Sequence, residues 1–254
     1  MKKLIVGNWK MFTTTAEAEL LVERVDKKML PTHGSEVVFC PPATALETLK
    51  NKLADLKHKH SFSLGIQNIY DQDEGPFTGE ISAAQVKDVV QYAIVGHSER
   101  RRLFHERDTD IAKKVAACLR HDIIPILCVG ETLTEREAKH SKRVVIDQLT
   151  ADLGYMTAQE LERIVIAYEP VWAIGTGNFA RPEEVTEMIT VIREHIEEHY
   201  GEIHGGSVRV LYGGSVEPDN ARMYLKIAGC DGLLVGGASI NYIKFAEIIN
   251  TSHS

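Results

Sequence analysis

The feature of this sequence that most constrains its fold is an alternation of strand and helix patterns that repeats along the whole chain. Short apolar runs recur, and each is followed by a polar turn and an amphipathic helical pattern, in units of roughly 30 residues. The apolar runs are continuous rather than alternating, which is typical of strands buried on both faces of a parallel sheet. The pattern therefore predicts an α/β protein.

Eight such units fit into the 254 residues. The expected strands are residues 3–8, 36–40, 61–67, 92–95, 123–129, 164–168, 208–211 and 232–235. The expected helices are residues 14–29, 44–57, a short helix after Ser82, 108–120, 134–150, 182–200, one from about residue 220, and 242–249. Eight units favour a closed (β/α)8 barrel over an open doubly wound sheet, and the turn after the first strand lacks the dinucleotide-binding glycine pattern. No linker divides the chain, so we expect a single domain over residues 1–254.

Charge and cysteine usage argue against several classes of function. The net charge of -7 argues against nucleic-acid binding, so an anionic substrate would need a local positive site. Cys40, Cys118, Cys128 and Cys230 are widely spaced, which indicates reduced thiols in a cytoplasmic protein. We expect no signal peptide and no membrane-spanning segment. We also expect no metal site, because the candidate ligands do not cluster.

Polar side chains follow several of the expected strands, at the points where those strands end. Asn8 and Lys10 follow the first strand, His97 and Glu99 the fourth, and Glu169 the sixth. In a (β/α)8 barrel these positions converge on one face. A carboxylate, an imidazole and an ammonium group suit proton abstraction beside a carbonyl, with Glu169 as the base and His97 as the hydrogen-bond donor.

The stretch AYEPVWAIGTG at residues 167–177 places Glu169 beside a candidate flap. Pro170 stiffens the exit from the strand, an apolar patch follows, and Gly175 and Gly177 tolerate unusual backbone angles at the far end. This pattern predicts a base that is open to solvent until a loop closes over it. The alternative is an ordinary strand end followed by a surface loop that carries a tryptophan.

Two glycine-rich turns follow the last two expected strands. They contain Gly213, Gly214 and Ser215 after the seventh strand, and Gly236 and Gly237 after the eighth. Backbone N–H groups at close approach, with helix N-termini behind them, predict a site for a phosphate dianion. The N–H of Gly175 could join it, whereas each glycine pair taken alone is also typical of a tight turn.

Two other functions are compatible with a barrel of this kind. A Schiff-base aldolase would use Lys10 as a nucleophile, but it would need that lysine in a dry pocket. A catalytically silent binding protein would be expected to lack Glu169, His97 or Lys10. Taken singly, His97 is also typical of a helix start and Lys10 of a solvated surface.

Five motifs together resemble the triosephosphate isomerase family over the whole chain. They are GNWKM at 7–11, GHSERR at 96–101, AYEPVWAIGTG at 167–177, YGGSV at 212–216 and LVGGAS at 234–239. The resemblance implies interconversion of dihydroxyacetone phosphate and D-glyceraldehyde 3-phosphate in glycolysis and gluconeogenesis, in the cytoplasm, without cofactor or metal. The chain departs from the family pattern at Phe12, Pro76 and Asn178-Phe179.

The resemblance also implies roles for individual residues. Glu169 matches the family's base, His97 its electrophile and Lys10 its electrostatic residue. Positions that match substrate or phosphate contacts are Asn8, Lys10, Gly175, Ser215, Gly236 and Gly237; supporting positions are Glu99, Thr78 and the buried Cys128. The loop at 68–79 matches one that enters a neighbouring subunit, so we expect a homodimer with Thr78 near the partner's Asn8 and Lys10.

Overall fold

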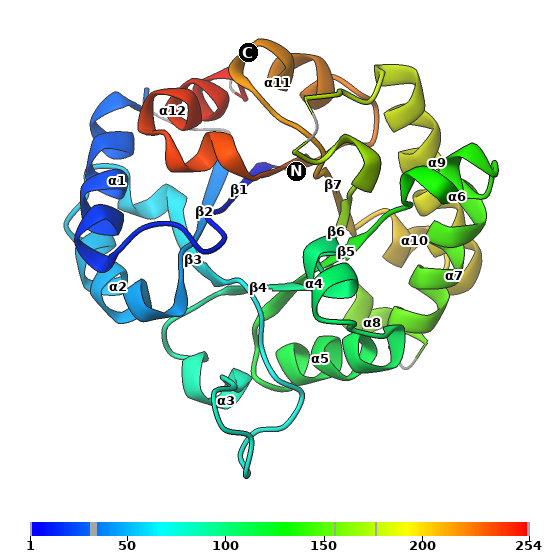
Figure 1. Cartoon of the computed structure of the whole chain (residues 1–254), viewed down its shortest axis with the longest axis horizontal. Helices are drawn as coiled ribbons and strands as arrows, with labels where there is room; N and C mark the ends of the chain where they lie inside the picture. The colour runs from blue at the N-terminus through cyan, green and yellow to red at the C-terminus, as the bar shows by residue number, and fades with distance from the viewer. Residues whose placement is uncertain (1, 31–34, 155, 176, 253–254) are drawn as a thin grey trace.

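The computed structural model describes residues 2–30, 35–154, 156–175 and 177–252, and its eight strands close into a parallel barrel in sequence order (Figure 1). The strands are β1 (Lys3–Asn8), β2 (Ser35–Cys40), β3 (Phe62–Ile66), β4 (Tyr92–Val95), β5 (Ile124–Val129), β6 (Val165–Tyr168), β7 (Arg209–Tyr212) and β8 (Gly232–Val235). The barrel closes where β1 pairs with β8. The predicted (β/α)8 fold is therefore confirmed.

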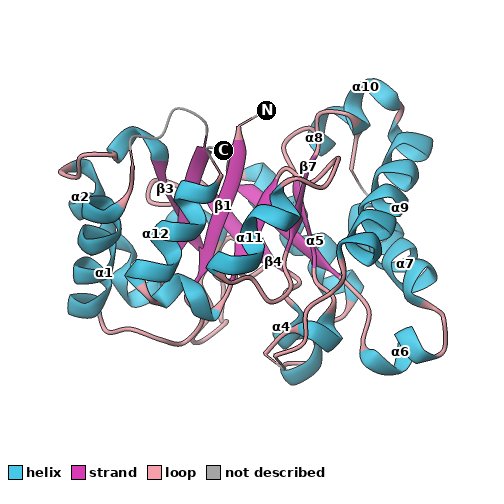
Figure 2. Cartoon of the chain, turned by 90° about the horizontal axis from the view of Figure 1, so that it is seen from above, coloured by secondary structure: helices cyan, strands magenta, loops and turns pink. Residues whose placement is uncertain are grey.

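Helices surround the barrel on its outside (Figures 1 and 2). They are α1 (Thr15–Lys28), α2 (Leu46–Ala54), α3 (Ala83–Val86), α4 (Ser98–Leu103), α5 (Asp108–Arg120), α6 (Leu133–Glu137), α7 (Ser141–Leu153), α8 (Ala158–Leu161), α9 (Pro182–Tyr200), α10 (Glu202–Gly205), α11 (Pro218–Leu225) and α12 (Tyr242–Thr251). Single 3₁₀ turns cover Ala43–Ala45, Lys59–Ser61, Val171–Ala173 and Gly237–Ile240. Within the described ranges, no helix is both long enough and apolar enough to cross a membrane.

The strands are buried on both faces, which explains their continuous apolar runs. Inside the barrel, side chains such as Leu4, Val6 and Ile94 form one apolar cluster. Their strand neighbours, such as Ile5 and Val95, join the larger cluster between the sheet and the helices. Because successive strand residues face opposite sides, one apolar run supplies both layers.

Two helix predictions were wrong in detail, and three short helices were missed. The helix expected from residue 44 begins at Leu46 instead, since a 3₁₀ turn precedes α2 and no side chain caps that helix. The helix expected at 134–150 is two helices, α6 and α7, separated near Lys139, whose φ is 61°. The short helices α4, α8 and α10 were not predicted, because segments of four to six residues carry too little periodicity.

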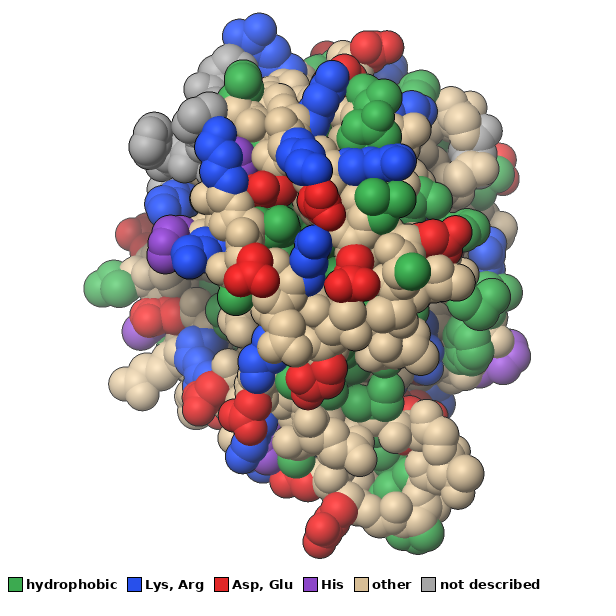
Figure 3. Space-filling view, turned by 90° about the vertical axis from the view of Figure 1, so that its left-hand side faces the viewer, with side chains coloured by type: hydrophobic (Ala, Val, Ile, Leu, Met, Phe, Trp, Pro, Cys, Tyr) green, Lys and Arg blue, Asp and Glu red, His purple; other side chains and the backbone are tan. Residues whose placement is uncertain are grey.

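The loop between β3 and α3 projects from the barrel at the bottom of Figure 1. We call residues 68–79 of this loop the arm. Acidic and basic side chains are intermixed on the molecular face in Figure 3, without a large area of one sign.

Candidate active site

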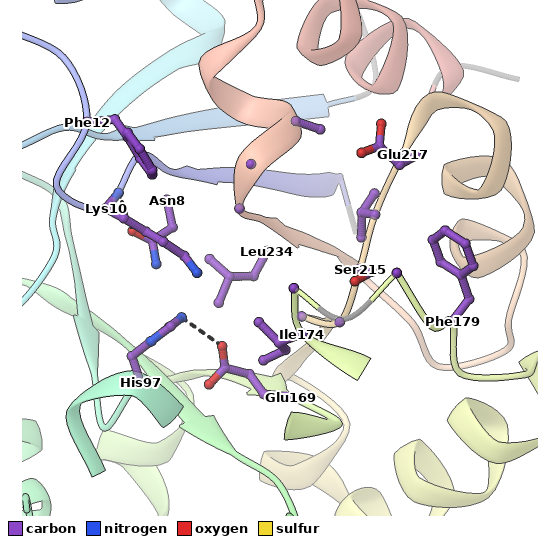
Figure 4. Close-up of a pocket in the computed structure, with 18 residues that line it drawn as sticks. Asn8, Lys10, Phe12, His97, Glu169, Ile174, Phe179, Ser215, Glu217 and Leu234 are labelled. Atoms are coloured by element: carbon purple, nitrogen blue, oxygen red, sulfur yellow. Dashed lines mark hydrogen bonds and ion pairs between the residues drawn. The ribbon is translucent and has the colours of Figure 1, made fainter. Parts of the chain in front are cut away.

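A pocket of about 390 Å³ lies at the carboxyl ends of the strands (Figure 4). Its wall contains every residue that was predicted to act on or bind the substrate: Asn8, Lys10, His97, Glu169, Gly175, Ser215, Gly236 and Gly237. Asn8 is the last residue of β1, and the others come from the segments that follow β1, β4, β6, β7 and β8. The barrel thus brings together side chains that are far apart in the sequence.

Glu169 directly follows β6 and is only 2 % exposed. Its backbone N–H donates to the carbonyl of Val129 on β5 at 2.8 Å, which fixes its position at the end of the strand. The side-chain Oε2 accepts the backbone N–H of Ser98 at 2.9 Å, and Oε1 lies 3.0 Å from Nε2 of His97. Figure 4 shows this contact between the carboxylate and the imidazole.

His97 is the N-cap residue of α4. Its Nδ1 accepts the backbone N–H of Glu99 at 3.2 Å, within the first turn of the helix. An accepting Nδ1 carries no proton, so the neutral ring has its proton on Nε2. That proton faces Oε1 of Glu169, which lies 3.0 Å from Nε2.

His97 and Glu169 face each other, and each shifts the pKa of the other. Burial opposes a charge on His97, but the carboxylate of Glu169 outweighs it and raises the pKa of His97 above its ordinary 6.5. Burial likewise favours the neutral form of Glu169. The contact with His97 and the hydrogen bond from Ser98 outweigh that effect and lower the pKa of Glu169 below its ordinary 4.5. Glu169 is therefore an ionised, buried carboxylate at neutral pH.

Lys10 has a left-handed backbone with a φ of 53°, which is costly for a residue other than glycine. The conformation is held from both sides. The N–H of Lys10 donates to Oδ1 of Asn8 at 3.1 Å, and its carbonyl accepts Nε2 of Gln67 at 2.7 Å. The ammonium group pairs with Glu99 at 2.5 Å. A Cβ built on Gly236 would lie 3.9 Å from Nζ, so the positive charge sits beside the glycine-rich turn.

The turn after β7 requires glycine for a steric reason. A Cβ on Gly214 would lie 2.2 Å from the hydroxyl of Tyr212 and 3.0 Å from the ring of Pro170. The next residue, Ser215, donates its hydroxyl to the carbonyl of Ala173 at 2.6 Å and so joins this turn to the segment after Glu169.

The segment that was predicted to be a flap is tied to a buried carboxylate. Glu131 is fully buried and accepts the indole N–H of Trp172 at 2.8 Å and the hydroxyl of Tyr168 at 3.1 Å. Burial raises the pKa of Glu131, against these hydrogen bonds. The guanidinium of Arg136 lies 4.1 Å from the centre of the Trp172 ring. Thr176, predicted as part of the flap, lies outside the described residues.

The predicted supporting residues lie in three different places. Glu99 contacts Lys10 as expected. Cys128 is 1 % exposed inside the barrel and does not line the pocket; burial raises its pKa well above the ordinary value. Thr78 lies on the exposed arm. Among the described residues there is no group of three or more potential metal ligands.

Sequence reasoning missed three residues that support the site. Ser98 contributes its backbone N–H to Glu169, Gln67 holds the backbone of Lys10, and Glu131 anchors Trp172. Glu131 carried a signal, since it is an acidic residue two positions after the end of a buried strand. The hydrogen bond from Ser98 uses its backbone N–H, so the type of residue at this position does not predict it.

Fold and pocket together define a (β/α)8-barrel enzyme with its site at the carboxyl end of the barrel. The sequence profile of one family, triosephosphate isomerase, matches residues 3–252. The chain belongs to the triosephosphate isomerase family.

Relatives with that name include the protein of Roseiflexus castenholzii, which is 45% identical over 248 residues, covering 97% of this chain and 96% of the relative. The protein of Alkaliphilus metalliredigens is 44% identical over 250 residues, covering 98% and 99%. That of Moorella thermoacetica is 42% identical over 250 residues, covering 98% of each. The resemblance drawn from the five motifs is confirmed.

Proposed function

We propose that this enzyme interconverts dihydroxyacetone phosphate and D-glyceraldehyde 3-phosphate, with Glu169 as the base and His97 as the hydrogen-bond donor. The observation that carries the proposal is the buried carboxylate of Glu169 at 3.0 Å from Nε2 of His97, in one pocket with two glycine-rich turns. One end of the pocket suits a carbonyl and its neighbouring carbon, and the other suits a phosphate.

In the proposed reaction Glu169 removes a proton from the carbon next to the carbonyl. The electron pair of that C–H bond forms the double bond of an enediolate, and the carbonyl oxygen takes up the negative charge. His97 donates its Nε2–H to this oxygen, and the ammonium of Lys10 stabilises the developing charge. Glu169 then returns the proton to the neighbouring carbon, while the hydroxyl proton on the first carbon passes to the former carbonyl oxygen and that hydroxyl becomes the new carbonyl. The reaction is thus balanced without an external acid, metal or cofactor.

The phosphate would bind to the backbone N–H groups of Ser215, Gly236 and Gly237. Helix α11 and the 3₁₀ turn Gly237–Ile240 begin directly behind these turns, and Lys10 lies beside them. We propose that the segment from Pro170 to Gly177 covers the bound intermediate and contributes the N–H of Gly175. Asn8, which lines the same pocket, would contact the substrate.

The aldolase alternative is disfavoured by the environment of Lys10. Its ammonium pairs with Glu99 at 2.5 Å and the side chain is 24% exposed, so Lys10 does not lie in the dry pocket that a Schiff-base lysine needs. A coupled assay with D-glyceraldehyde 3-phosphate tests the isomerase directly, and borohydride treatment in the presence of a ketose phosphate tests the alternative. Isomerisation without a trapped adduct supports the proposal, whereas a covalent adduct at Lys10 would contradict it.

We further propose that two copies form a homodimer through the arm. A second pocket of about 450 Å³ adjoins the first and shares Asn8, Lys10 and His97 with it. Its rim carries Met11, which is 95% exposed, and Phe104, which is 64% exposed. Exposed apolar side chains around a pocket are typical of an interface. The arm of a second subunit, with Phe77 and Thr78 at its tip, would fill this pocket next to Lys10.

The compartment follows from the cysteines. All four are buried and unpaired, as expected of a protein that works in the reducing cytoplasm. We therefore propose a cytoplasmic enzyme with triose phosphates as its small-molecule partners and no nucleic-acid partner.

A further inference from the structure

The outer half of the arm has little contact with the body of its own subunit. Residues 72–79 are all exposed, and only Ile69 at the base of the arm is buried. The aromatic ring of Phe77 packs on Tyr70 inside the arm, with ring centres 4.6 Å apart. A polar hollow of about 560 Å³, lined by residues such as Glu74 and Lys113, separates the arm from α5. The outer arm is therefore not held by an apolar core.

The end of helix α5 instead contacts the outer half of the arm through the carboxylate of Asp73. Oδ1 of Asp73 accepts Nη2 of Arg120 at 2.7 Å and lies 2.9 Å from Nε2 of His121. Nη2 of Arg120 also donates to the backbone carbonyl of Asp71 at 3.3 Å. Arg120 is the last residue of α5 and His121 is its C-cap. We call these three side chains, Asp73, Arg120 and His121, the clasp.

The clasp holds over a wide pH range. The hydrogen bonds from Arg120 and His121 lower the pKa of Asp73 to about 2, so its carboxylate stays ionised well into the acid range. Nε2 of His121 can donate to this carboxylate in the neutral ring as well as in the protonated one. The other charged groups around the clasp are Asp71, Glu74 and Lys113.

We propose that the clasp preorganises the arm for insertion into the second subunit, so that the lifetime of the dimer depends on Arg120 and His121, which lie outside the docking pocket. This inference rests on the proposed homodimer. Neither Arg120 nor His121 lines the pocket that would receive the arm. A segment that is ordered before association loses less conformational entropy when it binds.

The magnitude of the effect follows from exposure and symmetry. Asp73 and Arg120 are each more than two-fifths exposed, so we expect one clasp to shift the balance between ordered and disordered arms by about threefold. A two-fold dimer uses both arms, and the two factors multiply. We therefore expect loss of the clasp to speed dissociation of the dimer by about tenfold.

The test is subunit exchange between two differently tagged populations of the full chain, at low and at high salt. Asp73→Asn and the pair Arg120→Gln with His121→Gln should each speed exchange by about tenfold. The three substitutions combined should act no more strongly than the Arg120 and His121 pair alone, because that pair already removes both contacts of the Asp73 carboxylate. Salt should speed exchange of the wild type more than that of Asp73→Asn.

The matched control is Asp122→Asn. Asp122 follows the clasp directly, forms an exposed ion pair with Arg163 at 2.8 Å, and has a φ of 58°, which asparagine tolerates. Its exchange should match that of the wild type. Exchange of Asp73→Asn at the wild-type rate would overturn the role of the clasp and leave the homodimer intact. A wild-type chain that elutes as a monomer would overturn the homodimer, and this inference with it.

Discussion

Shortening the side chain at position 169 tests the proposed base most directly. Both carboxylate oxygens of Glu169 are engaged, one with the N–H of Ser98 at 2.9 Å and one with Nε2 of His97 at 3.0 Å. Glu169→Asp removes one methylene and draws the carboxylate back by about 1 Å, while the backbone stays fixed by its hydrogen bond to Val129. The charge remains, but it no longer reaches the position from which it would act.

The expected loss can be stated as a rate. Misplacement of a reacting group by about 1 Å costs on the order of 10² in rate. This corresponds to about 2.7 kcal/mol of transition-state stabilisation, at about 1.36 kcal/mol for each factor of ten. Because the phosphate turns are untouched, kcat should fall while KM changes little.

The measurement is the coupled assay for isomerisation, with kcat and KM determined separately. Glu169→Gln is the matched variant, since it keeps the length of the side chain and removes its basicity. We expect it to lose more activity than Glu169→Asp. Circular dichroism and inhibition by inorganic phosphate should match the wild type in both variants. A Glu169→Asp enzyme that folds normally and retains near-normal kcat would remove Glu169 from the role of base.

Three further outcomes are expected. In an NMR titration of Glu169→Gln, the pKa of His97 should fall below its ordinary 6.5, because the raising carboxylate is gone while burial remains; an unchanged pKa would contradict the coupling. Shortening the flap within residues 171–176 should release the enediolate, so that methylglyoxal and inorganic phosphate become major products; slower isomerisation alone would refute shielding. A variant with charged residues in place of Phe77 and Thr78 should be a monomer by light scattering and should have low activity. A wild-type chain that is an active monomer at micromolar concentration would exclude the dimer.

The repeated pattern of strands and helices predicted the architecture because strands that are buried on both faces consist of continuous apolar runs. Three of the eight predicted strands have the observed bounds, and the other five differ by one residue at one or both ends. The helix at 134–150 was predicted as one element because the periodicity continues across the break. The left-handed Lys139 that separates α6 and α7 is not a glycine and gave no signal.

The candidate site was predictable where it depends on side chains that follow strands. The convergence of Asn8, His97 and Glu169 on one pocket follows from barrel topology alone. The parts that were missed depend on the backbone or on distant contacts. The left-handed Lys10 needs Gln67 from another strand end, and this requirement appears in neither residue's own segment.

The spacing between Glu169 and His97 depends on a residue outside the pocket. The two residues follow β6 and β4, and β5 lies between these strands. A Cβ on Gly130, directly after β5, would lie 1.7 Å from the carbonyl oxygen of Glu169, so β5 and β6 can approach here only because residue 130 is glycine. Gly130 is itself held from α7, where Oε1 of Gln148 accepts its N–H at 2.8 Å. The position of the proposed base is thus set by contacts that run from an outer helix through a neighbouring strand to the backbone of Glu169.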